Sequence, residues 1–512
     1  MACREERVLR RFRSLLVLAL VVCLSAAALA QAAQTEIVIV HTNDTHARLQ
    51  PIMVDDQQRG GMARVAGFVQ VLRSLYPGRV LWLDAGDTIH GTNVANLFYG
   101  ESVVEMLNAA GVAAMTLGNH DFNYGQEVLL ARMAEANFPV LGANIVYSDS
   151  GELFAGQSAL FDVDGVTVAV LGLSTQDTPI VTHPKNVVGL TFRDPVEVAG
   201  ELVPALRSQA DVVVVLSHLG FDEDLRLARS VSGIDVIVGG HSHTQLDEPV
   251  AVGDTVIVQA NEYGKFLGFV KLTVEDGKVV DVVGQLLPIT ADAPVDLTVQ
   301  GIIDSWEAQL DAQLDQLVGE ALVDLNGERE FVRTRETNLG NLVADILRET
   351  VGADIGLTNG GGIRASIPAG PISLRDIYTV LPFDNILVGI ELTGAQILAA
   401  LEHSVSAYPA QLGGFLQVSG LTFTFDANKP AGQRVVEVLV DGQPLDLDRV
   451  YRVATNDFLA AGGDGYEMFL GARWIYGTQM ADGEFLRDVA AAYVRERGTI
   501  APQVEGRITV IE

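Results

Sequence analysis

Residues 37–46 read IVIVHTNDTH, a β-rich apolar run that leads directly into a cluster of polar side chains. The same pattern recurs four times before residue 245, at 80–87 (VLWLDAGD), 114–121 (AMTLGNHD), 212–218 (VVVVLSH) and 236–243 (VIVGGHSH). Short runs rich in Val, Ile and Leu are typical of buried strands. In packed α/β layers the strand ends meet at one edge of a sheet, so we expect these polar side chains to surround one shared site.

The side chains at these strand ends are oxygen and imidazole donors. Such mixed ligands suit divalent cations such as Mn²⁺, Zn²⁺, Fe²⁺ or Mg²⁺. Each motif alone is weak, because Gly-Asp usually marks a turn and a single histidine is often a satisfied core residue. The ordered set of five predicts a metal site.

Length and charge set outer limits on the protein. The 512 residues are too many for one core, which favours two large domains. The formal charge of −31 argues against a nucleic-acid polymer as partner, because phosphate backbones are held by clustered Lys and Arg. It does not argue against a small anionic substrate.

Residues 1–30 resemble a signal peptide, with five arginines, an apolar run over 15–24 and a small-residue cleavage site at 28–30. We expect an exported protein, periplasmic or secreted, with no stable membrane anchor after cleavage. The alternative is an N-terminal membrane anchor. Both cysteines, Cys3 and Cys23, lie in this segment, so the mature chain is predicted to hold neither disulfide nor thiolate ligand.

The rest of the chain divides into three parts. Residues 35–290 alternate β-rich and amphipathic stretches. Apolar residues then recur at helical spacing over 297–317, between Pro294 and Gly319, which predicts a linking helix over 296–318. A second α/β domain is predicted over 319–512. The helix could equally pack within one domain.

The first-domain motifs carry a family resemblance. Asp44-x-His46, Gly86-Asp87, Gly118-Asn119-His120, His218 and Gly240-His241-x-His243 resemble the motifs of calcineurin-like metallophosphoesterases. The stretch HTNDTHAR at 41–48, with GGMAR at 60–64, resembles the secreted 5′-nucleotidase family. The resemblance implies a four-layer α/β/β/α metallophosphoesterase domain over 35–290 and two divalent metal ions, Mn²⁺, Zn²⁺ or similar. One ion would be held by Asp44, His46, Asp87 and His243, and the other by Asp87, Asn119, His218 and His241.

Two further residues of this domain have implied roles in catalysis. The resemblance implies that His120 stabilises the transferring phosphate and the leaving oxygen, while two cations activate water for in-line attack. Family members often carry Asp three residues later, where this chain has Asn123. Asn can accept a hydrogen bond from imidazole but cannot balance its charge, so we expect His120 to be less readily protonated here. Cyclic-nucleotide phosphodiesterases share this Asn.

The second half contains RTRETNLGN at 333–341 and NGGGIR at 359–364. Three glycines before Arg364 suit a backbone pressed against a ligand, with the guanidinium aimed at a phosphate or carboxylate. Arg333 and Arg335 alternate, so they would share one face if they lay on a strand, or be solvated surface charges. Phe383 and Phe458 are single aromatic residues near glycine-rich or polar turns, where a base can stack but where core packing is the commoner role.

The order of these motifs resembles the C-terminal nucleotide-binding domain of 5′-nucleotidases, a smaller α/β domain. The resemblance implies that Phe383 and Phe458 sandwich the base and that Asp464 holds the ribose. It also implies nucleotide contacts for the polar residues Arg333, Arg335, Asn359 and Arg364. The active site would then lie between the domains.

The sequence therefore predicts an extracytoplasmic hydrolase that releases phosphate from nucleoside 5′-monophosphates, with di- and triphosphates and UDP-sugars as further candidates. One alternative is a 2′,3′-cyclic-nucleotide 2′-phosphodiesterase with 3′-nucleotidase activity, which Asn123 keeps open. A thiosulfate-handling relative would leave the base-stacking residues unexplained. A third alternative is a non-catalytic nucleotide-binding surface protein, which the full set of seven ligand residues disfavours.

Overall fold

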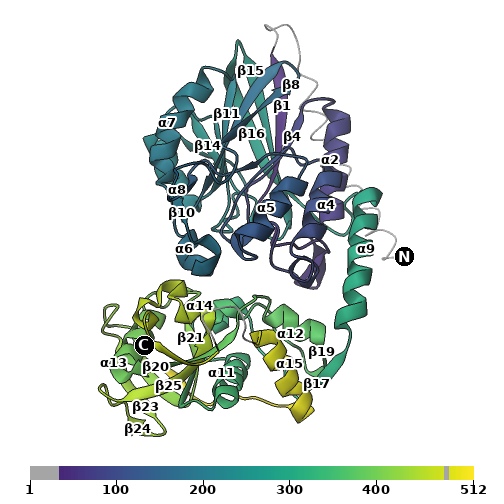
Figure 1. The fold of residues 1–512 in the computed structure, drawn as a ribbon. Coiled ribbons are helices and arrows are strands. Elements are labelled where there is room, and N and C mark those ends of the chain that lie inside the picture. The colour runs from purple at the N-terminus through teal and green to yellow at the C-terminus, as the bar shows by residue number, and fades with distance from the viewer. Residues whose placement is uncertain (1–33, 478–483, 512) are drawn as a thin grey trace.

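The computed structural model describes residues 34–477 and 484–511; the expected signal peptide lies outside them. Two α/β domains are joined by the long helix α9 (Leu297–Leu314), which runs along one side of the molecule (Figure 1). Within the described residues, no helix combines the length and apolar character needed to cross a membrane.

The first domain contains two six-stranded sheets. The first has the order β16-β15-β1-β4-β5-β6, in which β1, β4, β5 and β6 are parallel. Its strands are β1 (Thr35–Thr42), β4 (Val80–Asp84), β5 (Ala114–Thr116), β6 (Val140–Leu141), β15 (Phe266–Glu275) and β16 (Lys278–Pro288). The second has the order β13-β14-β12-β11-β9-β8. Its strands are β8 (Ser158–Val163), β9 (Val166–Ser174), β11 (Val212–His218), β12 (Val236–Gly239), β13 (Val250–Val252) and β14 (Thr255–Val258).

The alternation of side chains along each strand builds four layers. Ile37 and Ile39 of β1 pack between the two sheets, against side chains of β9 and β11 such as Val214. Val38 and Val40 point the other way, onto α2 (Met62–Leu75) and α4 (Glu101–Ala110). The second sheet is covered on its far side by α7 (Pro195–Arg207) and α8 (Phe221–Ser230). Because both faces of each central strand are buried, the runs are apolar throughout, and the predicted α/β/β/α architecture is confirmed.

The linking helix α9 packs against the first domain. Asp296 caps its N-terminus by accepting hydrogen bonds from the N–H groups of Thr298 and Val299. Its apolar face, which includes Ile303 and Leu310, belongs to the same core as α2 and α4. The helix is shorter than the predicted 296–318, because Asp315 and Gln316 break it and β17 (Leu317–Ala321) pairs with β19 of the second domain.

The second domain is built on a five-stranded sheet of order β21-β18-β25-β20-β26. Its strands are β18 (Ile355–Asn359), β20 (Leu387–Thr393), β21 (Leu416–Ser419), β25 (Val450–Asn456) and β26 (Arg473–Tyr476). The main helices are α11 (Asn338–Val351), α12 (Leu374–Val380), α13 (Gly394–Ser404) and α15 (Leu486–Arg497). A three-stranded sheet consists of β17, β19 (Gly370–Ser373) and β27 (Thr499–Ile500), and a four-stranded sheet of β22 (Leu421–Asp426), β23 (Val435–Val440), β24 (Gln443–Pro444) and β28 (Ile508–Ile511).

Short elements carry much of the site. In the first domain they are η1 (His120–Phe122), α6 (Thr178–Val181) and η2 (Pro184–Val187), and in the second α10 (Arg329–Val332), η3 (Gly360–Gly362), α14 (Asp457–Ala460) and η4 (Gly463–Gly465). The remaining short elements are β2 (Ile52–Val54), β3 (Gln57–Arg59), α3 (Asn93–Asn96), α5 (Gln126–Glu135), β7 (Ile145–Tyr147), β10 (Leu190–Phe192) and η5 (Glu467–Phe469).

Candidate active site between the two domains

The seven predicted metal ligands gather at one end of the two sheets of the first domain. They follow β1, β4, β5 and β12 or end β11, as the repeated sequence pattern predicts. Five of them have a left-handed backbone, with φ between 45° and 72°: Asp44, His46, Asp87, His241 and His243. This conformation is uncommon for residues other than glycine and persists where the surrounding structure imposes it, typically at functional sites.

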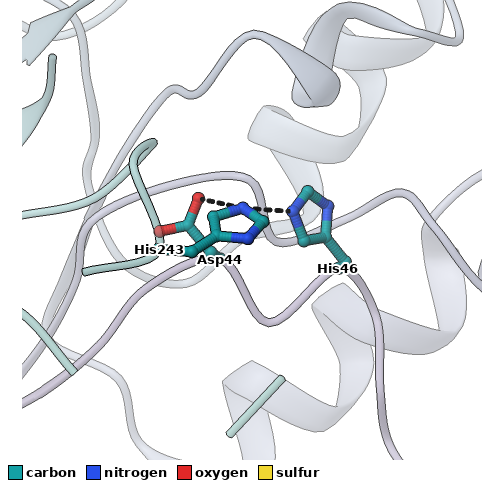
Figure 2. A group of neighbouring side chains, drawn as sticks. All are labelled: Asp44, His46 and His243. Atoms are coloured by element: carbon teal, nitrogen blue, oxygen red, sulfur yellow. Dashed lines mark hydrogen bonds and ion pairs between the residues drawn. The ribbon is translucent and has the colours of Figure 1, made fainter. Parts of the chain in front are cut away.

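The first ligand group consists of Asp44, His46 and His243 (Figure 2). The Nε2 atom of His243 lies 3.4 Å from Asp44 Oδ1 and 3.3 Å from His46 Nε2. The other ring nitrogen of His243, Nδ1, contacts the carboxylate of Glu262, which also pairs with Lys265. Burial lowers the pKa of His243, but Asp44 and Glu262 outweigh it and raise the pKa to about 9.

The second ligand group consists of Asp87, His218 and His241, with Asn119 beside them. His218 Nε2 lies 3.3 Å from Asp87 Oδ2, and His241 Nδ1 lies 2.9 Å from Asn119 Oδ1. Asp87 stands between the groups, because the same Oδ2 atom is 3.9 Å from His46 Nε2. This position is suited to a carboxylate that bridges two cations.

The protonation pattern of His218 fits a cation. Its Nδ1 lies 2.7 Å from the Ala85 carbonyl oxygen, which can only accept, so Nδ1 carries a proton and Nε2 has the lone pair when the ring is neutral. Nε2 faces the Asp87 carboxylate yet makes no hydrogen bond within the described residues. Burial lowers the pKa of His218, but Asp87 raises it to about 10. In the metal-free protein this raised pKa places a second proton on Nε2, next to the Asp87 carboxylate. A divalent cation that replaced this proton would meet an imidazole nitrogen and a carboxylate oxygen, a donor set that suits such an ion.

Asp121 holds together the two turns that follow β4 and β5, although no sequence argument singled it out. Its buried carboxylate accepts four backbone N–H bonds of 2.8–3.0 Å, from residues 87, 88, 89 and 118. Burial, together with the nearby Asp87 charge, raises the pKa of Asp121 to about 7. The carboxylate therefore ties the turn after β4 to the turn after β5.

His120 lies beside the ligands, with a ring nitrogen within 4.8 Å of the ligand atoms of His46 and Asp87. Its partner is Asn123, but the direction of the hydrogen bond differs from the one expected. Thr182 Oγ1 donates to Asn123 Oδ1 (2.8 Å), and the Asn123 amide nitrogen lies 2.9 Å from His120 Nδ1 and 3.1 Å from His90 Nδ1. An amide nitrogen can only donate, so both imidazoles accept, and a neutral His120 carries its proton on Nε2.

Both domains line one cavity of about 610 Å³. From the first domain it includes the ligands His46, Asp87, Asn119, His241 and His243, together with His120 and Asn123. The second domain contributes six of its seven predicted residues, all except Arg335: Arg333, Asn359, Arg364, Phe383, Phe458 and Asp464. The two predicted half-sites therefore form one site.

The arginines of this cavity differ in part from those predicted. Residues 329–332 form the short helix α10 rather than a strand, so Arg333 points into the cavity while Arg335 is exposed and lies over the Phe331 ring. Arg329 lines the cavity instead, with Nη1 3.4 Å from His243 Nδ1. Burial, with the charges of Arg364 and Arg329, lowers the pKa of Arg333 to about 9. The spacing of four between Arg329 and Arg333 was the signal in the sequence.

The two predicted base-stacking residues occupy different surroundings. The Phe383 ring stacks on His90 at 5.4 Å and on His120 at 6.0 Å between ring centroids, and Arg364 lies over it. Phe458 is 8% exposed and has its ring 6.4 Å from that of His183. Beside them, the Asn359 amide donates to Asp464 Oδ2 (2.8 Å), and burial raises the pKa of Asp464.

Comparisons with known proteins agree with this site. Residues 37–245 match the family model described as calcineurin-like phosphoesterase, and residues 317–471 match the 5′-nucleotidase C-terminal domain. A 5′-nucleotidase of Diplobatis ommata is 34% identical over 96% of this chain and 93% of its own length. The chain belongs to the 5′-nucleotidase family.

Two further relatives of this 5′-nucleotidase family member are a longer bacterial protein and a solved structure. The trifunctional nucleotide phosphoesterase protein YfkN of Bacillus subtilis is 36% identical over 92% of the chain, which spans 35% of that longer protein. A solved structure named as a 5′-nucleotidase precursor from Thermus thermophilus superposes with a TM-score of 0.84 at 38% identity. It covers 93% of this chain and 100% of that one.

Three histidines outside the predicted set, His90, His183 and His403, also have partners in or beside the site of this 5′-nucleotidase family member. His90 shares the Asn123 amide with His120. His403 Nε2 lies 2.7 Å from the Asp464 carbonyl oxygen and so supports the loop that carries this residue. His183 pairs with Asp457 across the domain boundary. The partners of all three are distant in the chain, so no local motif marks them.

Proposed function

We propose that the chain hydrolyses nucleoside 5′-monophosphates at the cavity between its domains. The observation that carries the proposal is the joint lining of this cavity by the metal-ligand groups, by Arg329, Arg333 and Arg364, and by Phe383 and Phe458. Arginine forks suit phosphate oxygens and aromatic faces suit bases, so one substrate with both parts fits the site best.

The proposed division of labour follows from the positions of the side chains. Two divalent cations, when bound by the seven ligands, would lower the pKa of water and neutralise charge on the phosphoryl group. Arg329, whose Nη1 atom lies 3.4 Å from His243 Nδ1, and Arg333, which lines the same cavity, would contact the phosphoryl group from the second domain. His120, with the Asn123 amide on Nδ1, presents an N–H donor at Nε2 to a phosphoryl or leaving oxygen.

A 2′,3′-cyclic-nucleotide 2′-phosphodiesterase activity is the second candidate. Asn123 supports it, because the sequence pattern with Asn at this position also occurs among cyclic-nucleotide phosphodiesterases. Export from the cytoplasm remains part of the proposal and rests on residues 1–30 of the sequence.

Phosphate release separates these possibilities. The enzyme, loaded with Mn²⁺ or Zn²⁺, is assayed with AMP, with UDP-glucose, and with 2′,3′-cyclic AMP followed by product analysis. AMP hydrolysis is the expected dominant activity. Preference for the cyclic diester would favour the second candidate, and tight nucleotide binding without turnover of any of the three would contradict the proposal.

A further inference from the structure

A segment of the first domain reaches across the boundary to the nucleotide side of the cavity. This segment contains α6 and η2, and α6 lies against η4, the turn that carries Asp464. In Figure 1, α6 projects from the first domain toward the second. The segment also lines the cavity, through Ile180, Val181, Thr182, His183, Lys185 and Asn186.

Two side chains of this segment bind one carboxylate of the second domain. His183 Nε2 lies 2.9 Å and Lys185 Nζ 3.2 Å from Asp457 Oδ2. His183 Nδ1 accepts from the Lys185 N–H (3.2 Å), so its proton sits on Nε2 and is donated to Asp457. We call these three residues the clasp. The hydrogen bond from His183 to Asp457 forms with the neutral imidazole, whose Nε2–H is the donor.

Asp457 holds both base-stacking segments of the second domain. It directly precedes Phe458, and its Oδ1 atom accepts from the N–H of Ile386 (2.9 Å), three residues after Phe383. The Asp457 N–H donates to the Ile386 carbonyl (3.0 Å). Its side chain is only 6% exposed, whereas that of Lys185 is 45% exposed. The clasp therefore joins the first domain to the point where the two base-stacking segments meet.

The other end of the segment is fixed at the chemical side of the cavity. Thr182, adjacent to His183, donates to Asn123 Oδ1 (2.8 Å), and the Asn186 amide donates to the Asn123 carbonyl (3.0 Å). Asn123 in turn holds His120. Residues 182–186 thus span from the histidine beside the metal ligands to the carboxylate beside Phe458.

We propose that His183 and Lys185 are positioning residues, which through Asp457 set the spacing between the base-stacking residues and His120. The inference rests on the proposed function. A nucleotide places its base at one end of the cavity and its phosphate at the other, so its binding depends on this spacing. A small aryl phosphate engages only the chemical end. The clasp therefore sets the preference for nucleotides over simple phosphate esters.

The test compares kcat/KM for AMP and for p-nitrophenyl phosphate. Removing a hydrogen bond to a charged group typically lowers affinity by about tenfold or more. Lys185→Met, and the double variant His183→Ala with Lys185→Met, should therefore lower kcat/KM for AMP by about that factor. The p-nitrophenyl phosphate value should stay within about twofold. Lys185→Arg, which keeps the charge, should retain most of the preference.

Two controls make the outcome decisive. Lys278→Met removes an exposed lysine on β16, away from the cavity, and should change neither value. A double-mutant cycle adds Asp457→Asn to the wild type and to the double variant. Asp457→Asn should lower kcat/KM for AMP less in the double variant than in the wild type, because the double variant already lacks both partners of Asp457. Equal losses for both substrates, an unchanged ratio or full additivity would overturn the inference. Absence of AMP hydrolysis in the wild type would instead refute the proposed function.

Discussion

Glu262 is predicted to control the affinity of one metal position. Its carboxylate contacts His243 Nδ1, on the side of the ring opposite the Nε2 atom that faces Asp44 and His46. A carboxylate at this position orients the ring and strengthens Nε2 as a donor. Burial raises the pKa of Glu262, but the hydrogen bond and charge of His243 lower it to about 2, so the group is ionised at all working pH values.

The expected effect of Glu262→Gln can be worked from this geometry. Loss of such a partner weakens metal binding by about 10- to 100-fold, equivalent to about 1.4–2.7 kcal/mol. Of the two proposed cations, only the one assigned to Asp44, His46, Asp87 and His243 should be affected, because Glu262 forms no ion pair with His218 or His241 within the described part of the chain. One of two metal equivalents should therefore be lost first.

Proton competition sets the pH at which the effect is clearest. The pKa of His243 is raised to about 9 without metal, so below that pH a proton competes with the cation for Nε2. Removing the Glu262 charge lowers this pKa and relieves part of the competition. The full loss of affinity should therefore appear near pH 9 and a smaller loss at pH 7.

The assay is metal content after equilibration with a graded series of Zn²⁺–chelator buffers. Lys265→Met is the matched control, since Lys265 pairs with Glu262 Oε1 (3.0 Å) but the interaction with His243 remains. Identical titration curves for Glu262→Gln and the wild type, loss of both equivalents together, or an equal effect of Lys265→Met would refute the reasoning.

Three further tests, using five substitutions, address the rest of the site. Phe383→Ala and Phe458→Ala should each lower kcat/KM for AMP by about 5- to 150-fold, which corresponds to the roughly 1–3 kcal/mol of one stacked base, with little effect on p-nitrophenyl phosphate; equal losses for both substrates would count against stacking. Arg329→Ala should lower kcat/KM for AMP at least about tenfold more than Arg335→Ala, because Arg329 lines the cavity and Arg335 does not; a larger effect of Arg335→Ala would reverse the assignment. Asn123→Asp replaces a donor to His120 Nδ1 by an anionic acceptor. Burial lowers the pKa of His120 to about 4, and the new negative charge should raise this pKa by about 1–3, which would move the corresponding limb of the pH–rate profile to higher pH. An unchanged profile would contradict this role.

Local sequence was sufficient to predict the strands of the first domain and the polar residues at their ends, and the family resemblance then implied which of these residues are metal ligands. Each apolar run is short, β-rich and followed at once by its polar residues, as at Val80 to Asp87. The information is local, because the same residues that form the strand also fix where it ends. Parallel pairing, such as that of β1 with β4, then brings the ends together. The grouping of the predicted ligands Asp44, His46, Asp87 and Asn119 at one sheet edge therefore follows from chain order and parallel pairing.

Contacts across long separations in the chain depended on the folded structure. The backbone of residues 329–332 is helical, and this turns Arg335 out and brings Arg329 in, a choice that alternation along the sequence could not make. The direction of the Asn123 hydrogen bonds depends on Thr182, which is 59 residues away. His183 meets Asp457 across 274 residues. Such contacts depend on how whole domains pack, because no local pattern specifies which distant side chain will satisfy a buried polar group.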